Sequence, residues 1–345
     1  MSTVLRQAPR DPNVVLSADW LTATLDRSHP GAVVTRTEVV ERLETVATKL
    51  RFRVHYTHQS DAPIALCAKG YFNPTQQRFP RAEGDFYRFA AHDLPVRTPP
   101  CVHAAVDEDT GHALVLMHDL VASGARFLDP RVGYSAQQAA ATLDQLAALH
   151  AATWDRRKTA LHTLFPSRLI SLSGHVSPAQ LQELLNDGRA HGVSASVRRG
   201  DRLAAAMAAM DRLRTESPSC VVHGDLHTGN IYELPGGVPG LIDWQVVQHG
   251  VWALDVAYHL ATVLSPDDLA DHERTLLDHY LDRLSAHAAT PPDRDRAWWM
   301  YRAYLPYGFF LWAMTRRVDR PITDHLTGRL GRAVERHRSL DLLGV

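Results

Sequence analysis

The apolar pattern of this chain changes its period near residue 120, and that change restricts the folds open to it. Between residues 50 and 56, apolar and polar side chains alternate one by one, which is typical of a strand with one buried face. Later segments, beginning with residues 136–154, have apolar residues at helical spacing. Because 345 residues exceed the usual size of a single hydrophobic core, two lobes are expected. We therefore predict an α+β protein with a small antiparallel sheet in an N-terminal lobe, residues 1–119, and a mainly helical C-terminal lobe, residues 120–345.

Local patterns predict the elements of the N-terminal lobe. The apolar run Ile64–Ala68 is short enough for a buried strand and follows a polar turn, so we expect it to form a hairpin with residues 50–56 and to end on Lys69. Residues 81–91 have helical period, with Glu83 on the inward face. Two further strands are predicted at Cys101–Val106 and Ala113–Met117, and two further helices at Ser17–Leu25 and Thr37–Leu43.

Charge and cysteine usage argue against several classes of protein. The formal net charge is -1 and no block of Lys or Arg is present, so the electrostatic footprint of nucleic-acid binding is missing. No segment approaches the length of a membrane span, and the N-terminus lacks the pattern of a secretion signal. Cys67, Cys101 and Cys220 are too few and too far apart for a disulfide framework. We expect a cytoplasmic protein with a small-molecule or protein ligand.

The segment from residue 221 to residue 244 holds the side chains best suited to chemistry. Asp225 and Asn230 lie five residues apart on a loop that leaves an apolar strand. Asp243 follows the next apolar pair after a turn that contains Gly and Pro, so a hairpin can bring all three together. Converging oxygen ligands suit Mg²⁺, which binds through few protein groups plus the phosphates of a substrate. The sequence therefore predicts Mg²⁺ rather than zinc.

The run His223-Gly224-Asp225, with Asn230 five residues later, is similar to the catalytic loop H-G-D-x-x-x-x-N of a known superfamily. This superfamily is the protein-kinase-like small-molecule phosphotransferases, which include aminoglycoside phosphotransferases, choline kinases and ecdysteroid-kinase-like proteins. Its later metal-binding Asp opens a segment that Asp243 resembles. The resemblance implies a two-lobed kinase-like fold, with ATP or GTP as the donor and a small-molecule hydroxyl as the acceptor. It also implies that Asp225 accepts the hydroxyl proton or orients the hydroxyl, and that Asn230 and Asp243 hold Mg²⁺.

The resemblance extends upstream to Lys69 and Glu83. The family pairs a Lys on the third strand of its small sheet with a Glu on the following helix, and these two residues occupy those places. The chain has only three lysines, so a compact ammonium at the end of an apolar strand suggests a specific need, which phosphate binding supplies. Glu83 on an inward helical face would be costly to bury alone, and Lys69 is its expected partner.

Other parts of the family pattern have two interpretations each. Asp255 lies where the family has an Asp that steadies the catalytic loop, but it suits a helix N-cap equally well. His227 either touches phosphate or substrate, or is a loop residue that faces solvent. The aromatic residues between 298 and 312 line an acceptor pocket or pack in a helical core, and we favour the core.

Three functions are compatible with these residues. The leading hypothesis is Mg²⁺-dependent transfer of the γ-phosphoryl group of ATP or GTP to a small-molecule hydroxyl. The family's nucleotide loop usually carries Gly, but Glu44–Leu50 has none, which motivates a second hypothesis: a nucleotide-binding protein of kinase fold without transfer activity. The third is a metallophosphoesterase, because residues 224–227 superficially resemble a dinuclear metal loop.

Overall fold

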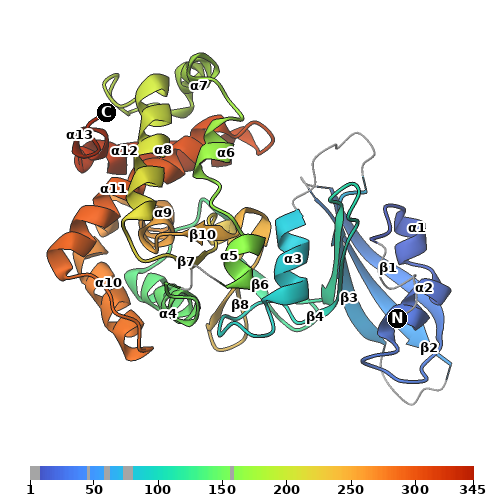
Figure 1. Ribbon diagram of the computed structural model, residues 1–345. Coiled ribbons are helices and arrows are strands. Elements are labelled where there is room, and N and C mark those ends of the chain that lie inside the picture. The colour runs from blue at the N-terminus through green and yellow to red at the C-terminus, as the bar shows by residue number, and fades with distance from the viewer. Residues whose placement is uncertain (1–7, 45–46, 58–62, 73–80, 156–158) are drawn as a thin grey trace. The chain divides into compact units, whose positions relative to one another are not determined.

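The computed structural model describes residues 8–44, 47–57, 63–72, 81–155 and 159–345. The chain divides into two compact units. Unit 1 comprises Met1–Asp93 and Thr98–Arg126, and unit 2 comprises Leu94–Arg97 and Phe127–Val345. Each unit has its own secondary structure (Figure 1).

Unit 1 is built on a five-stranded antiparallel sheet with the strand order β1-β2-β3-β5-β4. Its strands are β1 (Val34–Glu44), β2 (Thr48–Tyr56), β3 (Ile64–Gly70), β4 (Cys101–Val106) and β5 (Ala113–His118). In β2 the alternate residues Leu50, Phe52 and Val54 are buried, which confirms the predicted one-sided strand. The predicted hairpin with β3 is also confirmed, since Leu50 pairs with Ala68.

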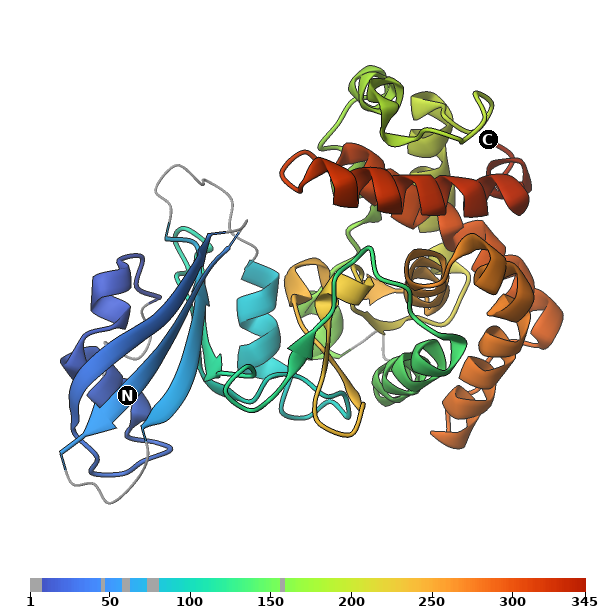
Figure 2. The same ribbon diagram turned by 180° about the vertical axis from the view of Figure 1, so that it is seen from behind.

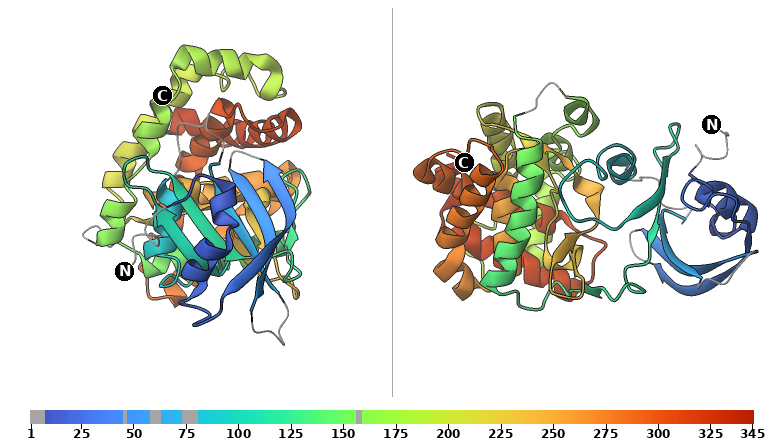
Figure 3. Two further views of the ribbon diagram at one scale, coloured as in Figure 1. Left: turned by 90° about the vertical axis from the view of Figure 1, so that its right-hand side faces the viewer. Right: turned by 90° about the horizontal axis from the view of Figure 1, so that it is seen from below.

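Helices cover both faces of this sheet. Figure 3 shows α1 (Pro12–Val15) and α2 (Ala18–Leu25) on one face and α3 (Arg81–Phe89) on the other. Trp20 and Leu21 of α2 share an apolar core with Phe52 of β2. On the opposite face, Gly84 lets α3 approach the sheet closely, because a Cβ atom there would lie only 2.7 Å from Cγ2 of Val106. The close approach places the neighbouring Glu83 directly over the sheet.

One predicted helix in unit 1 is wrong. Residues Thr37–Leu43 form part of β1, which pairs with β2 from Val34 opposite Tyr56 to Glu44 opposite Thr48. The apolar side chains of this segment, Val39, Val40 and Leu43, are exposed rather than gathered on a buried helical stripe. β-branched residues favour extended backbone, and pairing with β2 outweighs the weak helical spacing. Of the predicted nucleotide loop, positions 45 and 46 lie outside the described residues.

Unit 2 is mainly helical, as predicted. Its helices are α4 (Ala136–Ala152), α5 (Ala160–Leu164), α6 (Leu169–Ser173), α7 (Pro178–Leu184), α8 (Gly200–Thr215), α9 (Ala253–Val263), α10 (Pro266–Ala286), α11 (Arg294–Met314), α12 (Arg320–Arg336) and α13 (Ser339–Leu342). α4 and α10 run side by side (Figures 1 and 2), and α11 packs against α9 and α12. Every residue of α9 is buried, so this helix forms the centre of the unit. Among the helices described, none is long and apolar enough to cross a membrane.

Short strands hold the loops between α8 and α9. β7 (Cys220–Val222) pairs with β10 (Gln248–Gly250), and β8 (Ile231–Glu233) pairs with β9 (Pro239–Leu241), while β6 (Arg126–Phe127) is a further short strand. Ile231 lies opposite Leu241, which confirms the hairpin predicted for this segment. Because Asn230 comes just before β8 and Asp243 just after β9, the hairpin brings both to the same end.

Candidate active site

Asp225, Asn230 and Asp243 lie on two neighbouring loops of unit 2 that main-chain and side-chain bonds join. The Ile242 N–H donates to the carbonyl oxygen of Asn230 over 3.0 Å, and Nε2 of His223 lies 2.9 Å from the carbonyl oxygen of Ile242. Within the first loop, Nδ2 of Asn230 donates to the carbonyl oxygen of Asp225 over 2.7 Å. The structure therefore brings these three predicted residues together.

Two backbone conformations shape these loops. Gly224 has a φ angle of 83°, and a Cβ atom there would lie 2.6 Å from the carbonyl oxygen of Val246, so the position requires glycine. Asp243 has a φ angle of 66°, in the left-handed region that residues other than Gly seldom adopt. Such conformations cost free energy and tend to occur at functional sites, where the surrounding structure maintains them.

Asp255, in the first turn of α9, holds the loop that carries Asp225 in place. Its Oδ2 accepts from the His223 N–H over 2.7 Å and its Oδ1 from the Gly224 N–H over 2.8 Å, while Nε2 of His150 lies 3.2 Å from Oδ2. Full burial pushes the pKa of Asp255 upward, but the bond with His150 and nearby positive charge hold it below the ordinary value. Of its two interpretations, loop anchoring is confirmed, because the N-cap of α9 is Trp252.

The carboxylate of Asp225 has a fixed orientation. Tyr258 Oη donates to its Oδ1 over 2.6 Å, and Nε1 of Trp312 donates to Tyr258 Oη over 2.7 Å. Burial raises the pKa of Asp225 to about 7; the bond from Tyr258 opposes this rise, and the negative charge of Asp243 adds to it. A carboxylate held in this way can accept a proton near neutral pH.

The sequence analysis missed Tyr258, although a signal was available. Tyr258 follows Asp255 by three residues in α9, a spacing that places both on one helix face. Tyr307 of α11 also reaches the loop, where its hydroxyl donates to the carbonyl oxygen of Gly224 over 2.7 Å. Most aromatic residues of α11 are nevertheless buried, which confirms the core interpretation for Tyr301, Tyr304, Tyr307, Phe309, Phe310 and Trp312.

His227 is buried inside the loop and does not face solvent, so that interpretation is wrong. The residue is only 8% exposed, and its Nδ1 accepts from the Gly229 N–H over 3.1 Å. The ring packs edge-on against Trp312, with 5.3 Å between the centroids. Burial lowers the pKa of His227 to about 4, which keeps the imidazole neutral at physiological pH.

Unit 1 holds the other two predicted site residues, Lys69 in β3 and Glu83 in α3. The two side chains are 7% and 6% exposed, and Nζ of Lys69 lies 2.9 Å from Oε1 and 2.7 Å from Oε2 of Glu83. The predicted pairing is therefore confirmed. Because a buried ion pair contributes little net stability, its presence is better explained by a task for the ammonium than by the fold alone. That task, holding phosphate, stays a prediction.

The oxygen atoms near Asp243 are of the kind that Mg²⁺ prefers. Asn230 uses its Nδ2 to bond to Asp225, and no described residue donates to its Oδ1, which leaves that oxygen as an acceptor. Asp243 adds a carboxylate. An amide oxygen and a carboxylate, completed by phosphate oxygens and water, match the usual Mg²⁺ site. Over the described part of the chain, no three His, Cys, Asp or Glu side chains are grouped so as to hold a metal by themselves.

Comparison with known proteins gives a family and a fold. The pattern of the phosphotransferase enzyme family matches residues 40–305. An ethanolamine kinase from Plasmodium vivax has a TM-score of 0.56 at 14% identity, covering 98% of this chain and 92% of that one. Two choline kinases are also similar, one from Cryptosporidium parvum (0.53, 12%, covering 95% and 97%) and one from Streptococcus pneumoniae (0.52, 15%, covering 93% and 98%). These low identities show a shared fold alone and confirm the predicted kinase-like architecture. No curated protein sequence matches the chain.

Proposed function

Because the chain belongs to the phosphotransferase enzyme family, we propose that it is a small-molecule kinase that moves the γ-phosphoryl group of ATP or GTP to a hydroxyl, with Mg²⁺ as cofactor. The observation that carries the proposal is the arrangement of Asp225, Asn230 and Asp243 on two loops that hydrogen bonds join. The buried Asp255 holds the first of these loops in place. Structurally similar proteins described as choline and ethanolamine kinases act on alcohols, which supports a hydroxyl acceptor.

In this proposal Asp225 is the catalytic residue. It accepts or orients the proton of the acceptor hydroxyl while the hydroxyl oxygen bonds to the γ-phosphorus and the bond to the β-γ bridging oxygen breaks. Tyr258, with Trp312 behind it, keeps the carboxylate oriented. Asn230 and Asp243 would hold Mg²⁺, which supplies charge neutralisation for the triphosphate.

Lys69 has the complementary task of binding phosphate oxygens. Glu83 fixes the direction of its ammonium, so little conformational entropy is lost when phosphate binds. We also propose a cytoplasmic location, where nucleoside triphosphates are abundant and where the free thiols Cys67, Cys101 and Cys220 remain reduced.

A triphosphate-consumption screen tests the proposal. The purified protein is incubated with ATP or GTP and a panel of amino alcohols, sugars, aminoglycosides and lipid-like alcohols, with Mg²⁺ or with EDTA. We expect nucleoside diphosphate to form only with a suitable acceptor and with Mg²⁺, together with a phosphorylated acceptor in the mass spectrum. Nucleotide binding without turnover of any acceptor would favour the transfer-inactive alternative. Hydrolysis of a phosphoester without nucleotide would favour the metallophosphoesterase.

Replacing Asp243 by Asn should raise the Mg²⁺ requirement. The substitution removes one negative charge from the proposed metal site, while Asn tolerates the left-handed backbone as well as Asp does. We expect the Mg²⁺ concentration for half-maximal activity to rise by about tenfold or more, with an unchanged melting temperature. Asp271→Asn, an exposed position on α10, is the matched control. An unaltered Mg²⁺ titration curve would remove Asp243 from the metal site.

A further inference from the structure

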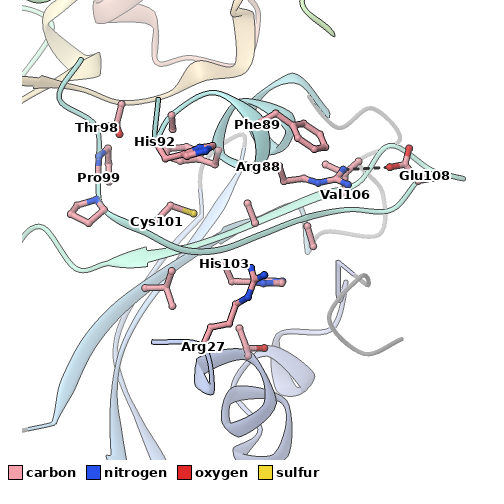
Figure 4. Close-up of a pocket in the computed structure, with 17 residues that line it drawn as sticks. Arg27, Arg88, Phe89, His92, Thr98, Pro99, Cys101, His103, Val106 and Glu108 are labelled. Carbon is pink, nitrogen blue, oxygen red and sulfur yellow. Dashed lines mark hydrogen bonds and ion pairs between the residues drawn. The ribbon is translucent and has the colours of Figure 1, made fainter. Parts of the chain in front are cut away.

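A pocket of about 800 Å³ lies within unit 1, and its lining includes neither Lys69 nor Glu83. Figure 4 shows its three sides: the strand β4, the end of α3 around Arg88 and Phe89, and Arg27 beyond the end of α2. All lining residues belong to unit 1. The volume falls in the range of ordinary ligand sites.

The floor of this pocket is a sheet edge without the usual protection. β4 is the last strand of the sheet, and its six residues include no Asp, Glu, Lys or Arg. Where the chain is described, main-chain hydrogen bonds join β4 only to β5, so its outward N–H and C=O groups remain open. The opposite edge, β1, is protected by charged residues that include Arg36, Glu38 and Glu41, and by two register shifts, against one in β4. β4 is therefore the edge suited to accept a further strand.

An arginine lies on each side of this edge. Arg27 has no hydrogen bond or ion pair with any residue that the structure describes, and Arg88 is shared between Asp85 and Glu108. Both arginines act on His103 of β4: burial first, then the charges of Arg27 and Arg88, lower the pKa of His103 to about 4. The only acidic residue of the lining is the exposed Glu108. Because Asp85 and Glu108 already offset the charge of Arg88, it is Arg27 that favours a negatively charged partner.

His103 adds an independent sign of a binding site. Its Nε2 is buried and lacks a hydrogen-bond partner within the described ranges, while its ring packs edge-on against Trp20 with 5.8 Å between the centroids. In Figure 4 the ring lies beside Arg27, on the α2 side of the strand. A buried polar atom without a partner costs free energy, so a hydrogen-bonding group supplied by a ligand would be stabilising here.

We propose that the outer edge of β4 is a docking site for an extended acidic peptide segment of another protein, which joins the sheet as a sixth strand. Main-chain hydrogen bonds to β4 would supply affinity, and alternate side chains of the peptide would supply specificity. On the α2 side, acidic side chains of the peptide would meet Arg27 and His103. None of the residues proposed for catalysis or for binding Mg²⁺ and phosphate lines this pocket.

A second copy of this chain is a less suitable occupant. Pairing of two β4 edges would place the arginines of one molecule near those of the other, and like charges at an interface cost affinity. The acidic side chains of a peptide would instead offset the charge of Arg27, while its main chain would form hydrogen bonds with the open edge of β4. The charge of the pocket therefore decides between the two partners.

Peptide binding to the full-length protein tests the proposal by fluorescence anisotropy. The probe is a labelled, end-blocked peptide Thr-Glu-Val-Glu-Val-Thr, compared with the same peptide carrying Gln in place of Glu. We expect saturable binding of the acidic peptide and at least about tenfold weaker binding of the Gln peptide. Two N-methylated versions of the peptide are also compared: in one, every odd-numbered amide carries a methyl group, and in the other, every even-numbered amide does. Only one version should abolish binding, because a strand uses one edge for pairing.

Two variants of the protein distinguish binding at the pocket from non-specific attraction between the peptide and positive charge. Arg27→Gln should weaken binding of the acidic peptide about tenfold. Arg36→Gln removes an arginine that is also exposed, from the opposite edge of the same sheet, and should have no effect. Equal losses in the two variants, equal effects of the two N-methylated versions, or no saturable binding would each overturn the proposal. So would light scattering that shows a dimer which the acidic peptide fails to dissociate.

Discussion

Replacing Asp225 by Asn should lower kcat about 10³-fold and leave nucleotide affinity largely unchanged. The amide cannot take the proton of the acceptor hydroxyl, but its oxygen can still accept the bond from Tyr258, so the loop keeps its shape. Nucleotide contacts assigned to Lys69, Asn230 and Asp243 stay in place. Steady-state kinetics with the acceptor found in the screen, together with calorimetric titration of nucleotide, measure the two effects separately.

The Asp225 prediction has a matched control and a clear failure. Asp271→Asn makes the same chemical change on the exposed face of α10 and should retain full activity. If Asp225→Asn turned over acceptor at the rate of the unmodified enzyme, Asp225 would not be the catalytic residue. A loss of nucleotide binding in parallel with kcat would instead indicate that the substitution disturbs the loop.

Replacing Asp255 by Asn should lower the free energy of unfolding by about 3 kcal/mol. Its carboxylate accepts from the N–H groups of His223 and Gly224 and is bonded to His150, all in a fully buried site. The amide of Asn offers one acceptor oxygen and an NH₂ group, so one buried donor would face another donor. Urea unfolding should show a lower midpoint with an unchanged slope.

A second readout distinguishes loop anchoring from general destabilisation. Well below the melting temperature, where the variant is folded, kcat should still fall, because the anchor sets the position of Asp225 through the preceding two residues. Asp267→Asn, in the exposed first turn of α10, should change stability by less than about 0.5 kcal/mol. Equal losses for the two variants would contradict the anchoring role of Asp255.

The sequence predicted those parts of the molecule that local patterns determine. Strict alternation in β2 indicates one buried face, and this pattern was sufficient to place the hairpin that carries Lys69 next to its last residue, Gly70. The spacing from Asp225 to Asn230, with a turn before Asp243, was sufficient to predict that the three residues meet. In both cases the informative residues are close in sequence, so the geometry follows from strand and turn chemistry.

Features that depend on distant contacts were missed. β1 has locally helical spacing, and only its pairing with β2 makes it a strand. Trp312, on α11, donates a hydrogen bond to Tyr258 and packs against the ring of His227. The orientation of Asp225 and the burial of His227 therefore depend on a helix far from the loop in sequence, and the loop sequence alone does not predict them.

Because of the β8–β9 hairpin, the distance in space between Asn230 and Asp243 does not depend on the number of residues between them. Asn230 and Asp243 are held together by the pairing of Ile231 with Leu241, whereas the tip at Gly236 and Gly237 is exposed, and a Cβ atom added at either glycine would meet no described atom within 4 Å. Residues added at the tip would lengthen the sequence between the two oxygen donors without moving either of them. We therefore expect the number of residues between the Asn and the second Asp to vary among distant relatives. A search pattern for such proteins should require a hairpin between the Asn and the second Asp, not a fixed count.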